Sequence, residues 1–97
     1  MEINHLNITV IGAGNLGKAM ALGLLDAGHP ASKLFLTRRN IDKLNEFSQK
    51  GCNVGSDNSL AVKQADLIIL AVKPYNIHEI LRSVAQDIDP KKHTLVS

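Results

Sequence analysis

Residues Asn7 to Gly17 read NITVIGAGNLG, and the interpretation of the whole 97-residue chain starts from them. The alternating run that ends in Val10 and Ile11 is typical of a β-strand. It leads directly into the turn GAGNLG, which begins at Gly12 and matches the pattern G-x-G-x-x-G. Where a strand precedes this pattern and a helix follows it, the pattern indicates a dinucleotide-binding turn. Both conditions are met in this sequence.

Each glycine in the turn has a separate structural task. We expect Gly12 to allow the tight turn after the strand, Gly14 to let the backbone approach a pyrophosphate, and Gly17 to let the next helix lie close to the strand. The helix N-terminus offers unpaired N–H groups to an anion. On its own the pattern is also compatible with a plain strand-to-helix connection, but a second strand follows at the distance that a nucleotide-binding unit requires.

The rest of the chain alternates between apolar strands and helical runs, which predicts a single α/β domain over residues 1–97. We expect a Rossmann-type doubly wound parallel sheet of order 3-2-1-4-5, truncated after the fifth strand. The predicted strands cover residues 7–11, 33–37, 52–54, 67–72 and 94–97. The predicted helices cover residues 16–28, 41–50, 60–64 and 76–88. The first helix is apolar around most of its circumference, so we expect it to be buried on more than one side.

The segment after the second predicted strand, Thr37-Arg38-Arg39-Asn40, indicates which cofactor the turn would take. NAD-binding units carry Asp or Glu about 20 residues beyond the glycines, where it accepts hydrogen bonds from the ribose hydroxyls. This chain offers hydroxyl and guanidinium groups instead. Because arginine binds a phosphate with paired charge-assisted hydrogen bonds, we expect NADPH in preference to NADH. The alternative is that both arginines lie on a solvated loop.

Two further segments continue the predicted site. Leu67 to Val72 is a continuous apolar run, as in a central parallel strand, and it ends at Lys73-Pro74. Residues 71–74 would then face the distal half of a dinucleotide, although Lys73 is equally compatible with a solvated strand end. Asn58 is interpreted most simply as a helix N-cap.

The start of the last predicted helix has its own local signal. Asn76 and Glu79 have the spacing of a capping box, with Asn in place of the usual Ser or Thr. The apolar residues that follow recur at helical spacing and predict a face packed in the core.

The composition excludes several classes of function. Eleven Lys and Arg against nine Asp and Glu give a net charge of +2, too small and dispersed to indicate nucleic acid or a membrane surface as a partner. The lone Cys52 rules out an internal disulfide and a cysteine metal cluster, and we expect it to be a small buried hydrophobe. No apolar run approaches the roughly 20 residues of a membrane span. We expect a cytoplasmic protein, with no metal site.

Four segments, in this order, resemble the N-terminal domain of the pyrroline-5-carboxylate reductases, and together they cover nearly the whole chain. They are IGAGNLG, the TRR after the second strand, Asp57-Asn58 before a short helix, and ADLIILAVKP from Ala65 to Pro74. The 6-phosphogluconate and F420-dependent enzymes share the general plan. Gly17 departs from the family, which often has alanine there. The chain stops in a predicted strand, so we expect it to be the N-terminal part of a longer polypeptide.

The resemblance implies an oxidoreductase that reduces the C=N bond of 1-pyrroline-5-carboxylate to L-proline with a hydride from NAD(P)H, in proline biosynthesis. It also implies a helical C-terminal domain, absent from this chain, that dimerises and supplies the substrate site. The implied cofactor site has three parts. Gly12, Ala13, Gly14, Asn15, Leu16 and Gly17 would hold the pyrophosphate, Thr37, Arg38, Arg39 and Asn58 the 2′-phosphate, and Ala71, Val72, Lys73 and Pro74 the nicotinamide ribose.

We assign no catalytic residue, because no side chain of this chain stands out as an acid that could protonate the imine. We therefore expect the chain to bind NADPH without turning over. Two other functions remain open. One is the cofactor domain of another NADP-dependent dehydrogenase, and the other is a regulatory module that senses a dinucleotide.

Overall fold

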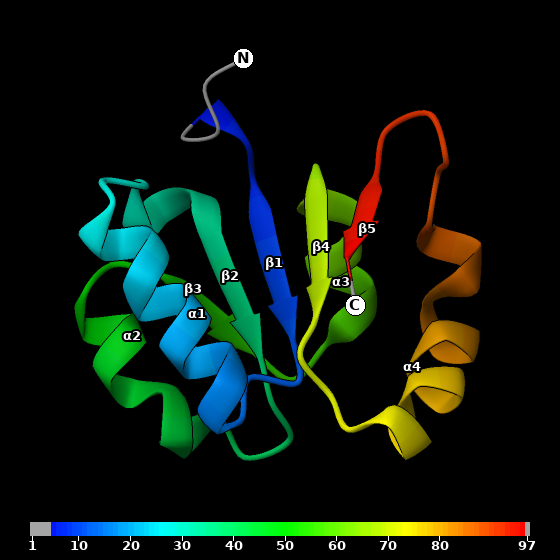
Figure 1. Ribbon diagram of the computed structural model, residues 1–97, viewed down its shortest axis with the longest axis horizontal. Helices are drawn as coiled ribbons and strands as arrows, with labels where there is room; N and C mark the ends of the chain where they lie inside the picture. Colours follow the sequence, from blue (N-terminus) through cyan, green and yellow to red (C-terminus); the bar gives the residue numbers. More distant parts are fainter. Residues whose placement is uncertain (1–4, 97) are drawn as a thin grey trace.

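The computed structural model describes residues 5–96 and contains one parallel sheet covered by helices on both faces (Figure 1). The sheet has the order β3-β2-β1-β4-β5, which confirms the predicted doubly wound topology. Its strands are β1 (Ile8–Ile11), β2 (Leu34–Thr37), β3 (Asn53–Gly55), β4 (Leu67–Leu70) and β5 (Thr94–Val96). The predicted end of the last strand, Ser97, lies outside the described residues.

The central strand β1 is buried along its whole length, and its residues alternate between the two faces of the sheet. Ile8 and Val10 pack in one apolar cluster with α1 (Asn15–Asp26) and with Phe47 of α2 (Asn45–Gln49). Ile11 packs in the other cluster with α3 (Asn58–Gln64) and α4 (Ile77–Val84). Both faces are thus covered, which is why the strands are continuously apolar.

Short 3-10 turns complete the connections between these elements. They are η2 (Ala31–Lys33), η3 (Ile41–Leu44), η4 (Pro74–Asn76) and η5 (Ala85–Asp87). The predicted helix after Asn40 is therefore split into η3 and α2. None of the helices in the described part of the chain combines the length and the apolarity that a bilayer span requires.

The first helix is less buried than its composition predicts. Only Gly17 and Ala21 of α1 are fully buried, while Leu16 is 68% and Leu22 is 38% exposed. The expectation of burial on more than one side is wrong, because only one face of α1 meets the sheet and no other element of the described chain covers the opposite face. The helix ends before Gly28, whose φ of +97° suits a glycine stop.

Two predicted helix caps are also corrected. The N-cap of α3 is Asp57, whose Oδ1 accepts the N–H of Leu60 at 3.1 Å, so Asn58 is the first residue inside the helix. Asn76 stands at the start of α4, but its side chain makes no capping hydrogen bond. The turn η4 leaves Asn76 with φ −98° and ψ −11°, a helical conformation rather than the extended one that a capping side chain needs. The capping box with Glu79 is therefore not formed.

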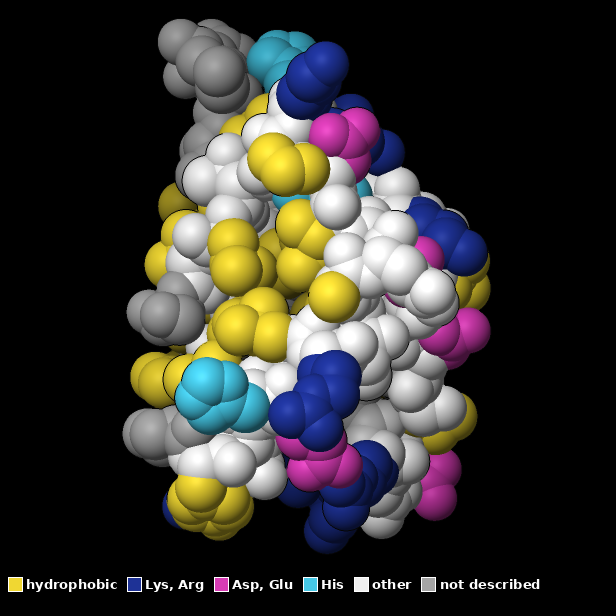
Figure 2. Space-filling view, turned by 90° about the vertical axis from the view of Figure 1, so that its right-hand side faces the viewer, with side chains coloured by type: hydrophobic (Ala, Val, Ile, Leu, Met, Phe, Trp, Pro, Cys, Tyr) yellow, Lys and Arg dark blue, Asp and Glu magenta, His cyan; other side chains and the backbone are white. Residues whose placement is uncertain are grey.

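The outer side of β5 leaves apolar side chains in contact with solvent. Leu95 is 42% and Val96 is 44% exposed. Figure 2 views the molecule from the side of α4 and β5, and hydrophobic side chains gather across the middle of that face. The predicted core face of α4 is confirmed, since Val84 is buried and Ile80 packs against the same cluster.

Candidate functional site

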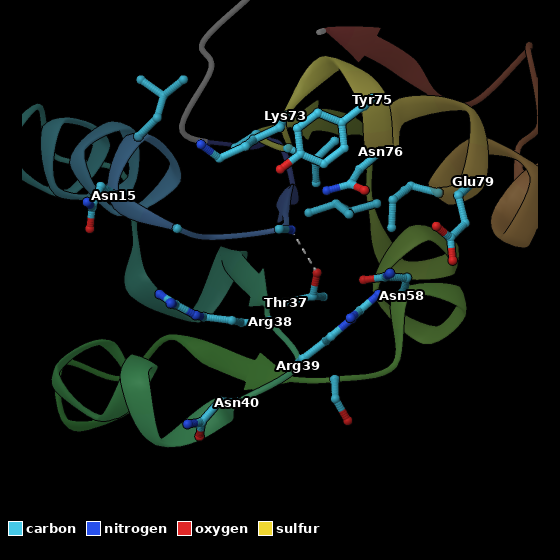
Figure 3. A pocket seen from close by; sticks show the side chains of 18 residues that line it. Asn15, Thr37, Arg38, Arg39, Asn40, Asn58, Lys73, Tyr75, Asn76 and Glu79 are labelled. Atoms are coloured by element: carbon cyan, nitrogen blue, oxygen red, sulfur yellow. Dashed lines mark hydrogen bonds between the residues drawn. The ribbon is translucent and has the colours of Figure 1, made fainter.

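A cavity of about 870 Å³ opens at the carboxyl ends of β1, β2 and β4 (Figure 3). This is the switch point of the sheet, because β2 and β3 lie on one side of β1, and β4 and β5 lie on the other. In a doubly wound sheet this edge is where ligands bind. The cavity is lined by the glycine turn, by the segments after β2 and β3, and by the segment from the end of β4 into α4. The lining residues are Ile11, Gly12, Gly14, Asn15, Leu16, Thr37, Arg38, Arg39, Asn40, Ser56, Asn58, Ala71, Val72, Lys73, Tyr75, Asn76, Glu79 and Ile80.

The glycine turn has the open backbone that the sequence predicts. Gly12 has a φ of +77°, and a Cβ at this position would collide with Cγ1 of Val72. The first hydrogen bond of α1 runs from the N–H of Lys18 to the carbonyl of Gly14 at 2.9 Å. The N–H groups of Asn15 and Leu16 lie ahead of that bond and find no backbone acceptor within the described chain. The first turn of α1 also has no acidic residue, so these donors are available to an anion.

Gly17 is the last glycine of the pattern and lies within α1, where it determines how closely this helix approaches the sheet. A Cβ built on it would lie 3.1 Å from the side chains of both Ala71 and Val10. The alanine that is common in the resembled family would therefore need these neighbours to shift by a few tenths of an ångström. Gly17 is buried and does not line the cavity, so its contribution is packing.

The end of β2 is tied to the glycine turn by two hydrogen bonds that a single residue, Thr37, accepts. The N–H of Gly12 donates to Oγ1 of Thr37 at 3.3 Å, and the N–H of Ala13 donates to the carbonyl of Thr37 at 2.8 Å. Thr37 is 1% exposed. Its main structural contribution is thus to hold the turn, and its side chain presents little surface to the cavity.

The two arginines after β2 differ in their contacts. Arg38 donates from Nη1 to the carbonyl of Ala13 at 3.2 Å, which fastens its guanidinium to the glycine turn. Arg39 is exposed and makes no side-chain hydrogen bond or ion pair within the described residues. In Figure 3 Arg39 extends across the cavity in the direction of Asn58. Of the two arginines after β2, Arg39 is therefore the one whose charge is available to a ligand.

The opposite wall follows β4 and the start of α4. The N–H of Ala71 donates to the carbonyl of Ile11 at 2.9 Å, which holds the end of β4 beside the glycine turn. Beyond it, Lys73 and Tyr75 stand at the rim, and Tyr75 is 78% exposed. Asn76 and Glu79 of the unformed capping box line the cavity as well.

Most of the residues predicted for the site lie together around this cavity, and two of those whose side chains are described do not line it. Ala13 is fully buried within the turn, and Gly17 packs against the sheet. The side chain of Pro74 lies outside the described part of the structure. Asn58, freed from capping by Asp57, does line the cavity. Within the described residues no group of three His, Cys, Asp or Glu side chains is placed to hold a metal ion.

Sequence reasoning missed several residues of the cavity wall. They are Ile11, Asn40, Ser56, Tyr75, Asn76, Glu79 and Ile80. For the four that follow Pro74, the available signal was their position in the sequence. They come a few residues after the carboxyl end of the central strand β4, and such connections line the ligand site of doubly wound sheets.

The sheet order, the glycine turn and the helix N-terminus at the switch point define a Rossmann-type dinucleotide-binding domain. The chain belongs to the family described as NADP oxidoreductase coenzyme F420-dependent, which matches residues 7–97. The predicted resemblance to pyrroline-5-carboxylate reductases is also confirmed. Pyrroline-5-carboxylate reductase 3 of Danio rerio is 33% identical over 97 residues, which are 99% of this chain and 33% of that protein.

Solved structures of similar proteins agree with the fold. A pyrroline-5-carboxylate reductase from Coxiella burnetii matches 94% of this chain and 36% of its own, with a TM-score of 0.83 and 30% identity. The pyrroline carboxylate reductase of Plasmodium falciparum, solved with NADP bound, matches 97% of this chain and 33% of its own with a TM-score of 0.81. At 23% identity it supports the fold alone. The chain spans about a third of the length of two curated relatives that it matches, pyrroline-5-carboxylate reductase 2 of Dictyostelium discoideum and the Danio rerio protein.

Proposed function

We propose that this chain is the NADP(H)-binding domain of a pyrroline-5-carboxylate reductase, which reduces the C=N bond of 1-pyrroline-5-carboxylate to give L-proline. The observation that carries the proposal is the open glycine turn beside a β2 end that offers Arg38 and Arg39 in place of a carboxylate. Guanidinium groups bind phosphate with charge-assisted hydrogen bonds, which suits a 2′-phosphate better than a hydroxyl. The curated relatives named as pyrroline-5-carboxylate reductases support the substrate.

The cavity fits NADP(H) in three parts. The pyrophosphate would lie over Gly14 at the N-terminus of α1, where donors are unpaired and a side chain at Gly12 would be excluded. The 2′-phosphate would face Arg39 and Asn58. The nicotinamide ribose would follow the end of β4, residues 71–74, of which residues 71–73 line the cavity. Ala13, Thr37 and Arg38 would support this site by fixing the turn.

NADPH supplies a hydride when it is bound, and the residues of this chain contribute orientation rather than acid or base chemistry. The turn that Thr37 and Arg38 hold would position the pyrophosphate, and the end of β4 would limit the position of the nicotinamide. We infer that a C-terminal helical domain, outside this chain, dimerises and provides the substrate site. We further infer a cytoplasmic enzyme without a nucleic-acid partner. The small net charge supports the last point.

The test begins with the chain itself. Titration with NADPH, followed by the change in cofactor fluorescence, should show saturable binding. The full-length gene product should then oxidise NADPH only when 1-pyrroline-5-carboxylate is present, whereas the 97-residue chain should bind NADPH without turnover. Absence of NADPH binding would refute the cofactor assignment. Substrate-dependent oxidation by the isolated chain would refute the division of roles between the two domains.

The family description favours a second candidate, another NADP-dependent oxidoreductase of the same architecture. Binding of NADPH together with no response to 1-pyrroline-5-carboxylate in the full-length product would favour this candidate. A sensing module would bind the dinucleotide, would not oxidise it whichever substrate is offered, and would change its association with a partner when NADPH is added.

A further inference from the structure

We propose that Glu79 is a specificity-determining residue that weakens the preference of this site for NADPH over NADH. Its carboxylate lies in the same cavity as the arginines after β2, where it opposes the binding of a 2′-phosphate but not of a 2′-hydroxyl. This inference rests on the proposed cofactor function and goes beyond it, because it concerns how strongly the site distinguishes two cofactors.

The first step is the charge of the cavity wall. Among the described residues that line the cavity, the cations are Arg38, Arg39 and Lys73, and Glu79 is the only acid. Arg38 is already engaged with the carbonyl of Ala13. The charges of Arg39 and Glu79 therefore decide the electrostatic environment that a ligand meets where the segment after β2 faces α4.

The second step is the direction of the side chain. The turn η4 prevents the predicted capping box, so the Glu79 carboxylate does not fold back onto the start of α4. It forms no hydrogen bond or ion pair with any of the described residues. In Figure 3 Glu79 projects from α4 toward the corner of the cavity that also holds Asn58, with Arg39 reaching in from the opposite side. Three elements thus bring one anion and one cation to the same corner.

The third step is how the charge at this corner distinguishes NADPH from NADH. The pyrophosphate is common to NADH and NADPH, so its repulsion by Glu79 is nearly the same for both. The 2′-phosphate adds negative charge to NADPH alone. A carboxylate beside its site repels it, while the same carboxylate can accept a hydrogen bond from a 2′-hydroxyl. A charge that acts against one of two ligands is a usual source of specificity.

The test compares NADPH and NADH titrations of the wild-type chain with those of Glu79→Gln, which keeps the size and helix propensity of the side chain. At low ionic strength the ratio of the NADH to the NADPH dissociation constant should rise by about threefold to tenfold, as expected for one nearby charge in a partly solvated site. The increase should shrink in about 1 M salt, where the screening length is about 3 Å.

Two control variants separate the position of the charge from other effects. Glu46→Gln removes an equal charge from the exposed first turn of α2, away from the cavity, and should change the ratio by less than about twofold. Glu79→Asp keeps the charge and should keep a ratio near that of the wild type.

An unchanged ratio in Glu79→Gln, with both cofactors still bound by the wild type, would overturn this inference and leave the proposed function intact. Equal changes for NADPH and NADH would also overturn it, since they would indicate a contact with the shared part of the cofactor. If the wild type bound neither cofactor, both the proposed function and this inference would fail.

Discussion

The N–H of Gly12 donates to Oγ1 of Thr37 at 3.3 Å, so the first glycine of the turn is held by the last residue of the neighbouring strand. The two residues are 25 positions apart in the sequence. The bond joins the part of the cavity that would bind a pyrophosphate to the part that would bind a 2′-phosphate.

Replacing Thr37 with valine tests this bond, since valine has nearly the same shape and no acceptor. The partly buried N–H of Gly12 loses its partner, and the cost should be at most the roughly 1–3 kcal/mol of a fully buried unsatisfied donor. We expect Thr37→Val to lower the free energy of unfolding in urea and to weaken NADPH binding. Thr9→Val is the matched control, because Oγ1 of Thr9 donates to the carbonyl of Ala61 at 2.8 Å, away from the cavity. It should lower stability and leave NADPH affinity unchanged.

A second prediction concerns Gly12 itself. Gly12→Ala combines an unfavourable φ of +77° with a collision against Val72. We expect a loss of roughly 2–4 kcal/mol of stability and no measurable NADPH binding. Gly23→Ala provides the contrast, because nothing lies within 4 Å of an added Cβ in the middle of α1. It should raise stability by about 0.5–1 kcal/mol in thermal or urea unfolding. A tolerated Gly12→Ala would contradict the geometry of the turn.

The arginines should respond differently to removal. Arg39→Ala should weaken NADPH binding by roughly tenfold to hundredfold, the value of hydrogen bonds to a charged group, and leave NADH binding nearly unchanged. Arg38→Ala should weaken both cofactors, because it releases the carbonyl of Ala13 in the glycine turn. Fluorescence titration with each cofactor distinguishes these patterns. Lys43→Ala, an exposed cation of η3 that does not line the cavity, is the control.

Cys52 should make stability depend on pH in the alkaline range. Burial raises the pKa of its thiol above the usual value of 9.0, an effect that the nearby Lys50 ammonium partly offsets. The unfolded chain then loses the thiol proton at a lower pH than the folded chain. Stability from this group is therefore complete below the unfolded pKa and falls as the pH rises from about 9 through the folded pKa.

Urea unfolding at a series of pH values tests the Cys52 prediction. The decline in stability above pH 9.0 should be shallower in Cys52→Ala than in the wild type, and thiol reagents should modify Cys52 much faster in urea than in buffer. Equal slopes for the two proteins would contradict it.

Local sequence signals predicted the fold because each acts over a few residues. The strand before Gly12, the glycine stop at Gly28 and the apolar run from Leu67 to Val72 indicated where elements begin and end, although β4 itself ends at Leu70. Parallel strands joined by helices then leave few possible topologies. The exposed side of α1 was not predictable in this way, since apolar composition does not show which neighbours are present to cover a helix.

The far wall of the cavity needed the three-dimensional structure. Helical periodicity placed Ile80 in the core, which is correct, but Ile80 also reaches the cavity. Asn76 and Glu79 matched a capping pattern that the turn η4 then prevented. Asn58 was interpreted as a cap because the sequence does not show that Asp57 takes that position. In each case a rule based on helix geometry gave the side chain a role in capping or packing, and the three-dimensional structure shows that it also lines the cavity.

The hydrogen bonds that join Thr37 and Arg38 to the glycine turn also separate two tasks within one cavity. In the proposed complex, the distance between the pyrophosphate and 2′-phosphate positions would be set by backbone atoms that these bonds hold in place. Cofactor choice would then depend on Arg39 and Glu79, whose side chains take no part in these bonds. Substitutions at Arg39 and Glu79 should therefore change the cofactor preference without disturbing the hydrogen bonds that hold the turn or the stability of the fold.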